Sequence, residues 1–191
     1  MRVIGGRSRG RRLKAKLPTT IRPTSDRVRE SIFDILGSQG GVEGLDVIDL
    51  FCGSGALGVE ALSRGAATAT FIDQDPGALA AVRQNLEAVG LDDANTTLVG
   101  AELPGWLRTP AARDGGAFDL VLCDPPYNFA GWAGLLTSLQ EIGTDMVVME
   151  SSSTIALPEG WMLTRERRYG GTLVTVAQSR TEPHAEGGAG A

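Results

Sequence analysis

The stretch LDVIDLFCGSGALG, residues 45–58, joins an apolar run to a turn that contains three glycines. Gly53, Gly55 and Gly58 have the spacing G-x-G-x-x-G, and Asp73 ends the next apolar run 20 residues after Gly53. In a strand–turn–helix unit, such glycines let the backbone pass close to a ligand, and the acid can accept hydrogen bonds from both hydroxyls of a ribose. The stretch therefore predicts a nucleotide-like ligand at the end of a parallel strand.

Apolar runs that predict strands alternate with amphipathic stretches that predict helices along most of the chain. Such alternation, with nearly continuous apolar strands, indicates an α/β fold with a parallel sheet covered by helices on both faces. Near the end, two runs joined only by Gly170 and Gly171 predict a hairpin, which places one antiparallel strand in the sheet. The predicted strands are 45–51, 68–73, 96–99, 118–123, 146–151 and the two hairpin runs within 161–179, and the predicted helices are 23–36, 57–64, 76–89, 103–107 and 132–142.

The chain has 191 residues, which is the length of one ordinary domain. It has neither an apolar run of about 18 residues that could cross a membrane nor an N-terminal signal pattern, so we expect a cytoplasmic protein with no membrane partner. Cys52 and Cys123 each close an apolar run, which predicts buried free thiols. His184 is the only histidine and has no nearby ligand partners, so we expect no metal site.

Basic side chains are concentrated near the N-terminus. Residues 1–30 hold ten basic and two acidic side chains, although the whole chain has a net charge of −5. We expect residues 1–22 to form a basic, RNA-binding extension, because contacts to phosphates release counterions and give affinity that is independent of sequence. A solvated, disordered N-terminus explains the same composition equally well. Residues 23–179 would then form the folded domain, and residues 180–191 a disordered tail.

Asp49 distinguishes two interpretations of the glycine turn. It lies just before the glycines, where its carboxylate can meet the cationic amino-acid part of S-adenosylmethionine. The same carboxylate would repel the pyrophosphate of a nicotinamide dinucleotide, so a dehydrogenase is the less favoured interpretation. Glu102 follows the third predicted strand and can accept a hydrogen bond from an adenine amino group, but an exposed acid at a helix start explains it equally well.

The segment FDLVLCDPPYNF, residues 118–129, places Asp124, Pro125, Pro126 and Tyr127 directly after the fourth predicted strand. An exocyclic amine of a nucleobase is a poor nucleophile. Acceptors at its protons, here the Asp124 carboxylate and the Pro125 carbonyl, stabilise the positive charge that develops during methyl transfer. The prolines fix the backbone, and Tyr127 offers a ring on which a flipped-out base can stack. The segment therefore predicts an amino-methylating loop rather than an ordinary turn.

Together these segments resemble the RsmD family of Rossmann-like, S-adenosylmethionine-dependent methyltransferases, which methylate guanine N2 in bacterial 16S rRNA. The resemblance rests on MRVIGGRSRGRRL, IRPTSDRVRESIFDIL and the Asp-Pro-Pro-Tyr loop, and it extends to about residue 177. It implies a class I methyltransferase fold with a mostly parallel seven-stranded sheet, and S-adenosylhomocysteine as the product. It also implies a monomer that acts on 16S rRNA or on a small ribosomal subunit assembly particle.

The resemblance further assigns residues to roles. Asp124, Pro125, Pro126 and Tyr127 match the catalytic loop. The residues that match the cofactor pocket are Asp49, Phe51, Gly53, Ser54, Gly55, Asp73, Gln74, Glu102 and Thr24. Thr24 also belongs to an N-terminal motif beside the active site, together with Arg22, Asp26, Arg29 and Glu30. The basic residues expected to bind RNA are Arg7, Arg9, Arg11, Arg12, Lys14, Arg22 and Arg29.

Other functions fit parts of the sequence. A DNA adenine-N6 methyltransferase could use the same loop, but 191 residues leave no room for a separate DNA-recognition domain. A protein glutamine methyltransferase would usually have Asn in place of Asp124 and needs no basic segment. A non-enzymatic RNA-binding module would leave the cofactor pocket unexplained. The leading prediction is therefore an rRNA guanine-N2 methyltransferase.

Overall fold

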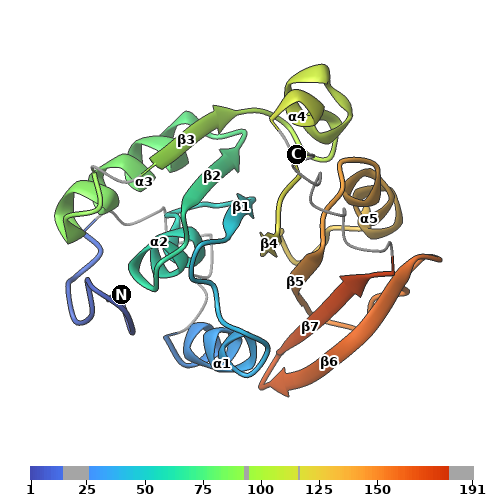
Figure 1. The fold of residues 1–191 in the computed structure, drawn as a ribbon, viewed down its shortest axis with the longest axis horizontal. Coiled ribbons are helices and arrows are strands. Elements are labelled where there is room, and N and C mark those ends of the chain that lie inside the picture. The colour runs from blue at the N-terminus through green and yellow to red at the C-terminus, as the bar shows by residue number, and fades with distance from the viewer. Residues whose placement is uncertain (15–25, 93–94, 116, 181–191) are drawn as a thin grey trace, which may run out of the picture.

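The computed structural model describes residues 1–14, 26–92, 95–115 and 117–180 (Figure 1). A seven-stranded sheet runs through the molecule, and helices cover both of its faces. The strands are β1 (Asp46–Leu50), β2 (Thr68–Asp73), β3 (Asn95–Gly100), β4 (Leu120–Cys123), β5 (Met146–Ser151), β6 (Trp161–Tyr169) and β7 (Thr172–Ser179). The helices are α1 (Asp26–Gly37), α2 (Ala56–Ser63), α3 (Pro76–Val89), the 3₁₀ turn η1 (Gly105–Arg108), α4 (Pro110–Asp114) and α5 (Trp132–Glu141).

The sheet has the strand order β3-β2-β1-β4-β5-β7-β6. Neighbouring strands are parallel from β3 to β5, whereas β7 is antiparallel to both β5 and β6. The predicted α/β fold, the hairpin and the single antiparallel strand are therefore confirmed. The chain order reverses between β1 and β4, and ligands of open parallel sheets bind at the carboxyl ends of strands at such a point.

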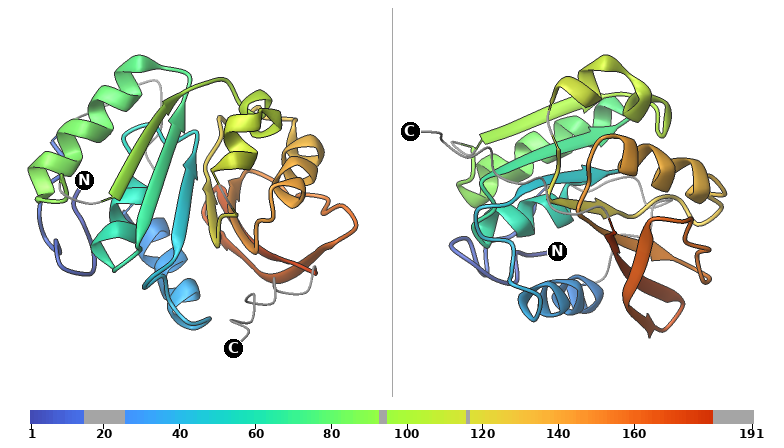
Figure 2. Two further views of the ribbon diagram at one scale, coloured as in Figure 1. Left: turned by 45° about the horizontal axis from the view of Figure 1, so that its top comes forward. Right: turned by 45° about the vertical axis from the view of Figure 1, so that its right-hand side comes forward.

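Helices α1, α2 and α3 lie on one face of the sheet, and η1, α4 and α5 lie on the other (Figure 1 and Figure 2). One core cluster lies between the sheet and α5, and two clusters lie on the opposite face, one under α1 and one between α2 and α3. Strand β4 consists only of buried residues, because it is central and covered on both faces.

Helix α3 shows how local signals set the boundaries of an element. Asp75 is its N-cap, and the Asp75 Oδ1 atom accepts a hydrogen bond from the Gly77 N–H at 2.8 Å. Pro76 occupies the first helical position, and Gly90 ends the helix with a φ of 65°. The helix therefore begins directly after β2 and leaves Asp73 at the edge of the sheet.

Residues 1–14 pack onto the body of the protein. Val3 and Leu13 are buried in the cluster between α2 and α3. The Glu60 carboxylate of α2 is 1% exposed and accepts hydrogen bonds from the backbone N–H groups of Ile4 at 2.8 Å and Gly5 at 2.7 Å. The interpretation of the N-terminus as a disordered, solvated segment is therefore wrong for these residues.

The other predictions about the ends of the chain fall largely outside the described residues. Residues 15–25 contain the expected end of the basic extension at residue 22, and residues 181–191 contain all but the first residue of the expected tail. Arg180 is tied to the fold, because its N–H donates to the Gly160 carbonyl at 2.8 Å. The division at residue 22 stays a prediction.

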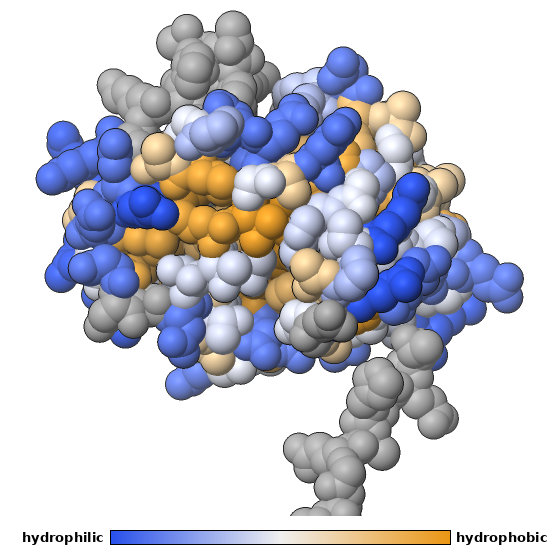
Figure 3. Space-filling model, turned by 90° about the horizontal axis from the view of Figure 1, so that it is seen from above, coloured by the Kyte–Doolittle hydropathy of each residue, from blue (hydrophilic) through white to orange (hydrophobic). Residues whose placement is uncertain are grey.

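The surface combines apolar and hydrophilic areas. Seen from above Figure 1, an apolar area is bordered by hydrophilic side chains (Figure 3). The large hydrophobic side chains that are exposed in the described part of the chain are Met1, Tyr127, Met162 and Leu163, of which Tyr127 follows β4. No helix in that part is long and apolar enough to cross a membrane.

Candidate active site

The carboxyl ends of β1, β2, β3 and β4 meet along one edge of the sheet. The register pairs Leu50 of β1 with Cys123 of β4, and Asp73 of β2 with Gly100 of β3. The glycine turn, Asp73 and Asp124 therefore follow neighbouring strands at the same edge. The structure thus brings the segments expected to bind the cofactor and the segment expected to catalyse the reaction into one region, which we call the catalytic edge.

The turn after β1 has an unusual backbone. Gly53 and Gly55 have φ values of 53° and 74°, in the left-handed region that a β-carbon disfavours. Phe51 also has a positive φ, 56°, which is rare for an aromatic residue and indicates local strain. Gly58 has a different role, because a Cβ at this position would overlap the Phe71 ring. The first two glycines permit the sharp turn, whereas the third lets α2 pack closely against β2.

Two carboxylates hold this turn in place. Asp49 is 2% exposed, and its Oδ2 atom accepts a hydrogen bond from the Gly58 N–H at 2.9 Å. Asp73 Oδ2 accepts from the Gly53 N–H at 2.9 Å, and Asp73 Oδ1 accepts from the Asp75 N–H at 2.9 Å. An ionised carboxylate can accept about four hydrogen bonds. Both side chains can therefore bind a ligand while they support the loop.

The carboxylates at this edge repel one another. Burial raises the pKa of Asp49 well above its usual range, the Gly58 N–H opposes this shift, and the negative charges of Asp124 and Asp73 add to it. A positively charged group among these side chains would relieve the repulsion and favour their ionised forms. The residues at this edge therefore fit a cationic ligand such as S-adenosylmethionine.

Cys52 and Cys123 lie beside these carboxylates as buried free thiols, which confirms the sequence prediction. Burial raises the pKa of both thiols. The nearby negative charges of Asp49 and Asp73 raise the pKa of Cys52 further, and those of Asp124 and Asp49 raise the pKa of Cys123 further. Both thiols are therefore protonated at neutral pH, and a protonated thiol is neither a nucleophile nor a metal ligand.

The Asp-Pro-Pro-Tyr loop is supported by an aromatic contact to the glycine turn. Pro125 is buried, whereas Tyr127 is 57% exposed. The Phe129 N–H donates to the Pro126 carbonyl at 2.8 Å, which closes a turn. The Phe129 ring packs edge-on against Phe51, with 5.2 Å between the ring centroids. The strained residue after β1 thus connects the two segments of the catalytic edge.

Sequence reasoning missed Phe129 and Trp132 as parts of this edge. The Phe129 ring also packs edge-on against Trp132, the first residue of α5, with centroids 5.1 Å apart. Three rings therefore connect the glycine turn to α5. The two aromatic residues that follow Tyr127 at short spacing were the signal in the sequence for this contact.

The remaining residues expected in the cofactor pocket differ in exposure. Ser54 is buried, and Gln74 and Glu102 are exposed beside the ends of β2 and β3. Thr24 lies outside the described residues. No three described His, Cys, Asp or Glu side chains form a group that could hold a metal ion.

The N-terminal segment, residues 1–14, carries most of the expected RNA-binding residues. The Arg11 Nη1 atom donates to the Val89 carbonyl at 2.6 Å, which ties the segment to the end of α3. Arg22 lies outside the described residues. The expected RNA-binding residues that are exposed on this segment are Arg7, Arg9, Arg11, Arg12 and Lys14.

Arg29 is a correction to the expected RNA-binding set. Its side chain is 0% exposed, its Nε atom is 3.5 Å from Glu60 Oε2, and its Nη2 atom donates to Asp26 Oδ1 at 3.0 Å. The same Nη2 atom donates to the Arg2 carbonyl. A guanidinium buried in this way is not accessible to phosphates in solution. Arg29 instead holds α1, α2 and the N-terminal segment together.

The sheet order, the acidic catalytic edge and the loop after β4 define a Rossmann-like, S-adenosylmethionine-dependent methyltransferase. The chain belongs to the RsmD family, because the family model described as Conserved hypothetical protein 95 matches residues 1–178. Ribosomal RNA small subunit methyltransferase D of Escherichia coli (strain K12) is 32% identical over 193 residues, which cover 97% of this chain and 93% of that protein.

Two further relatives are similar over nearly their whole length. YlbH of Bacillus subtilis (strain 168) is 37% identical over 187 residues, which cover 94% of this chain and 100% of that protein. The solved structure of yhhF from Escherichia coli has a TM-score of 0.80 at 33% identity and covers 95% of this chain and 99% of that chain. The family predicted from the sequence is therefore confirmed.

Proposed function

We propose that this protein transfers a methyl group from S-adenosylmethionine to the exocyclic N2 of a guanine in 16S rRNA. The observation that carries the proposal is that Asp124 and its loop follow β4 at the same edge of the sheet as Asp49 of β1, Asp73 at the end of β2 and the glycine turn after β1. Methyl transfer requires a cofactor and an amine to meet at one place, and the catalytic edge offers a site for each. Membership in the RsmD family supports the same reaction.

The proposed cofactor site uses Asp49, Asp73 and the glycine turn. When bound, S-adenosylmethionine supplies an electrophilic methyl group on a sulfonium. Asp49 would attract the positive charge of the cofactor, and Asp73 would accept hydrogen bonds from its ribose hydroxyls. The further residues proposed for this pocket are Phe51, Gly53, Ser54, Gly55, Gln74, Glu102 and Thr24.

The loop after β4 would prepare the guanine amine for attack. The Asp124 carboxylate and the Pro125 carbonyl accept hydrogen bonds from the amino protons, which reduces delocalisation of the nitrogen lone pair and stabilises the positive charge that develops on the nitrogen. The amine then loses one proton, which Asp124 or water can accept. Pro126 restricts the backbone of the loop, and the exposed Tyr127 ring offers a stacking surface for a flipped-out base.

The exposed basic residues of the N-terminal segment would bind RNA phosphates. Their charge is local, because the whole chain is acidic with a net charge of −5. In keeping with the RsmD family, we propose a small ribosomal subunit assembly particle as the substrate, a monomer as the active form and the cytoplasm as the place of action.

A methylation experiment with tritiated S-adenosylmethionine tests the proposed function. The acceptors are naked 16S rRNA, small ribosomal subunits, DNA and a protein extract, and Asp124→Ala is the inactive control. We expect label in the RNA acceptors, recovered as N2-methylguanosine after digestion to nucleosides. Label recovered as N6-methyladenine in DNA, or as methylated glutamine in protein, would support the alternatives instead.

A further inference from the structure

A second basic surface lies at the end of the sheet formed by β6. This edge strand has the sequence WMLTRERRY, in which Arg165, Arg167 and Arg168 are exposed and Glu166 is the only acid. Within the described residues, no carboxylate lies within 4 Å of these three guanidinium groups. The strand therefore carries positive charge that ion pairs of the described residues do not neutralise.

The end of β6 lies at the catalytic edge. Arg168 pairs with Leu173 of β7, and Leu173 pairs with Ser151, the last residue of β5. Arg168 Nη1 also donates to the Ser152 carbonyl at 3.3 Å, directly after β5. Because β5 is parallel to β4, its end and the Asp124 loop lie at the same edge. Three strand spacings of about 4.8 Å, roughly 14 Å in all, separate β6 from β4.

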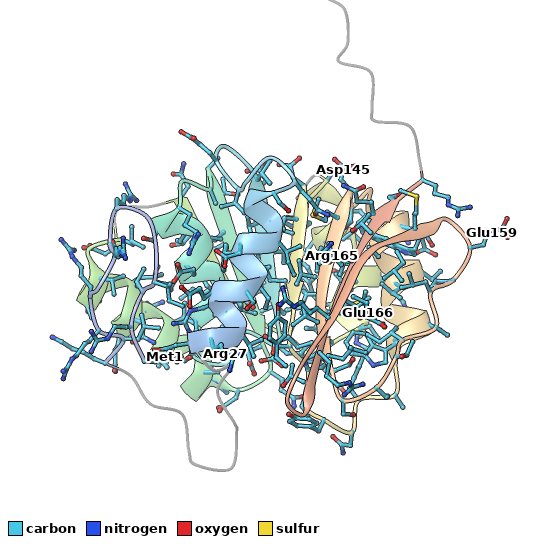
Figure 4. All side chains as sticks on the ribbon, turned by 90° about the horizontal axis from the view of Figure 1, so that it is seen from below. Met1, Arg27, Asp145, Glu159, Arg165 and Glu166 are labelled. Carbon is cyan, nitrogen blue, oxygen red and sulfur yellow. The ribbon has the colours of Figure 1, made fainter. Side chains whose placement is uncertain are left out.

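A groove of about 450 Å³ between β6 and α1 leads toward this edge. Arg165, Arg167 and Tyr169 line one wall and α1 forms the other, and the two elements lie side by side in Figure 4. Gln39, which follows α1, donates to Thr164 Oγ1 at 3.4 Å. The C-terminal end of α1 therefore lies beside the start of β6, and its N-terminal end lies toward Tyr169.

Arg27 extends the basic surface along α1 toward the catalytic edge (Figure 4). It is exposed, and it precedes Ser31, which lines the groove, by about one helical turn. Asp34 also lines the groove, but it lies in the second half of α1, away from the edge, and the exposed Glu30 precedes Ser31 on α1. Arg27 and Arg167 therefore lie toward the catalytic edge, whereas Arg165, which follows Thr164, lies toward the other end of the groove.

Arg167 is oriented by an aromatic ring. Its guanidinium carbon lies 5.4 Å from the centroid of the Tyr169 ring, which packs against the core cluster under α1. Stacking on a ring restricts a guanidinium without neutralising its charge, and its N–H groups can still bind phosphate oxygens in pairs. The groove thus presents a preoriented guanidinium group that can bind a phosphate.

We propose that Arg27, Arg165 and Arg167, which lie on the α1 face of the sheet, form a phosphate-binding surface for the RNA substrate. The inference rests on the proposed function and extends it to a second region of contact. The N-terminal segment lies beside α2 and α3, whereas β6 lies at the other end of the sheet (Figure 1). An RNA that contacts both surfaces while its target base reaches Asp124 is bound at both ends of the sheet, which fixes its orientation.

The salt dependence of RNA binding tests this surface. The variant is Arg165→Gln/Arg167→Gln. The control, Arg83→Gln/Arg113→Gln on α3 and α4, removes the same number of positive charges. The probe is a single-stranded RNA oligonucleotide. Two lost phosphate contacts should make the slope of log affinity against log salt shallower by about 1.4, so the wild type should lose about sevenfold more affinity than the variant between about 50 and 200 mM salt. The control should keep the wild-type slope, and both variants should keep their circular dichroism spectra and their S-adenosylmethionine affinity.

Three outcomes would overturn the inference. One is an unchanged slope in the β6 variant. Another is an unchanged slope together with new self-association, which would mean that the arginines only protect an exposed edge strand. A third is unchanged binding of naked RNA with weaker binding of small subunits, which would indicate a protein contact. If the β6 variant misfolds, the single variants Arg165→Gln and Arg167→Gln should each make the slope shallower by about 0.7, and an unchanged slope in both would overturn the inference. Failure of the wild type itself to bind and methylate rRNA would refute the proposed function instead.

Discussion

Asp73 is the last residue of β2 and Asp124 follows β4, with β1 between these two strands. The two side chains have different surroundings. Asp73 accepts hydrogen bonds from the N–H groups of Gly53 and Asp75, so it is part of the support of the glycine turn. Asp124 is half-buried at the start of the loop after β4, and its charge acts on Asp49. Loss of Asp73 should therefore affect cofactor binding, whereas loss of Asp124 should affect the chemical step.

We expect Asp124→Ala to lower the single-turnover rate of methyl transfer by about 10²–10³-fold, because the variant loses an acceptor aimed at charge that develops in the transition state. Affinity for S-adenosylmethionine, measured by calorimetry, should remain close to that of the wild type. Asp124→Asn is the matched control, since it keeps an acceptor oxygen and removes the charge, and it should show a smaller loss. A near-normal rate in Asp124→Ala would rule out the proposed role of the loop.

The buried Asp49 leads to a prediction about pH. Its pKa is raised in the folded protein, so the folded state binds this proton more tightly than the unfolded state does. The stability of the free protein should therefore fall as pH rises from the ordinary carboxyl range through the raised pKa. In Asp49→Asn, which keeps an oxygen to accept from Gly58, thermal melting should depend less on pH, and the melting temperature at neutral pH should rise.

The same Asp49→Asn variant should bind S-adenosylmethionine more weakly, because the partner of the cationic cofactor is lost. The exposed Asp92→Asn is the control and should follow the wild type in both melting and binding. If Asp49→Asn retained the wild-type pH profile of melting, a different group would be responsible for that profile.

Among the elements, the N-terminal segment differs most from its prediction, and the reason is physical. Val3 and Leu13 lie in a basic stretch whose few apolar residues lack the periodicity that predicts a strand or helix. Their packing accompanies hydrogen bonds from the Ile4 and Gly5 N–H groups to Glu60, a residue more than 50 positions away from both. Arg29 could not be recognised as buried for the same reason, since its partner is also Glu60.

The catalytic edge was more predictable than the N-terminal segment. The glycine turn, Asp73 and the Asp-Pro-Pro-Tyr loop each follow an apolar strand, and parallel strands bring such positions to one edge. The contact between Phe51 and Phe129 could not be predicted, because it depends on the left-handed backbone of Phe51 and on the path of a loop. Local patterns thus place the side chains that follow strands, whereas contacts between loops require the structure.

The packing of the N-terminal segment predicts its contribution to stability. Leu13→Ala should lower the free energy of unfolding by about 2–3 kcal/mol, as expected for a buried leucine near the surface of the core. The neighbouring exposed Lys14→Ala is the control and should change stability little. Denaturant unfolding at equilibrium measures both. Equal stability of the two variants would mean that the segment is not an integral part of the body in solution.

The whole molecule combines an acidic body with two basic surfaces, on the N-terminal segment and on β6. Because the net charge is −5, the average interaction with a polyanion is repulsive at long range. Attraction is confined to the two basic surfaces, which lie toward opposite ends of the sheet, one beside α2 and α3 and one on β6. The charge distribution therefore favours encounters in which the RNA meets one of these two surfaces.

This arrangement predicts an effect on association rates. Arg9→Gln/Arg12→Gln should slow association with small ribosomal subunits in stopped-flow measurements at low salt and change dissociation less, because exposed charges at the rim of an interface act mainly on the encounter. At about 1 M salt, where the Debye length is about 3 Å, the difference should disappear. Arg83→Gln/Arg113→Gln changes the net charge equally at residues outside both surfaces and should slow association less. If this control slowed association as much as Arg9→Gln/Arg12→Gln, the total charge of the protein, and not the placement of the charge on the N-terminal segment, would govern the encounter.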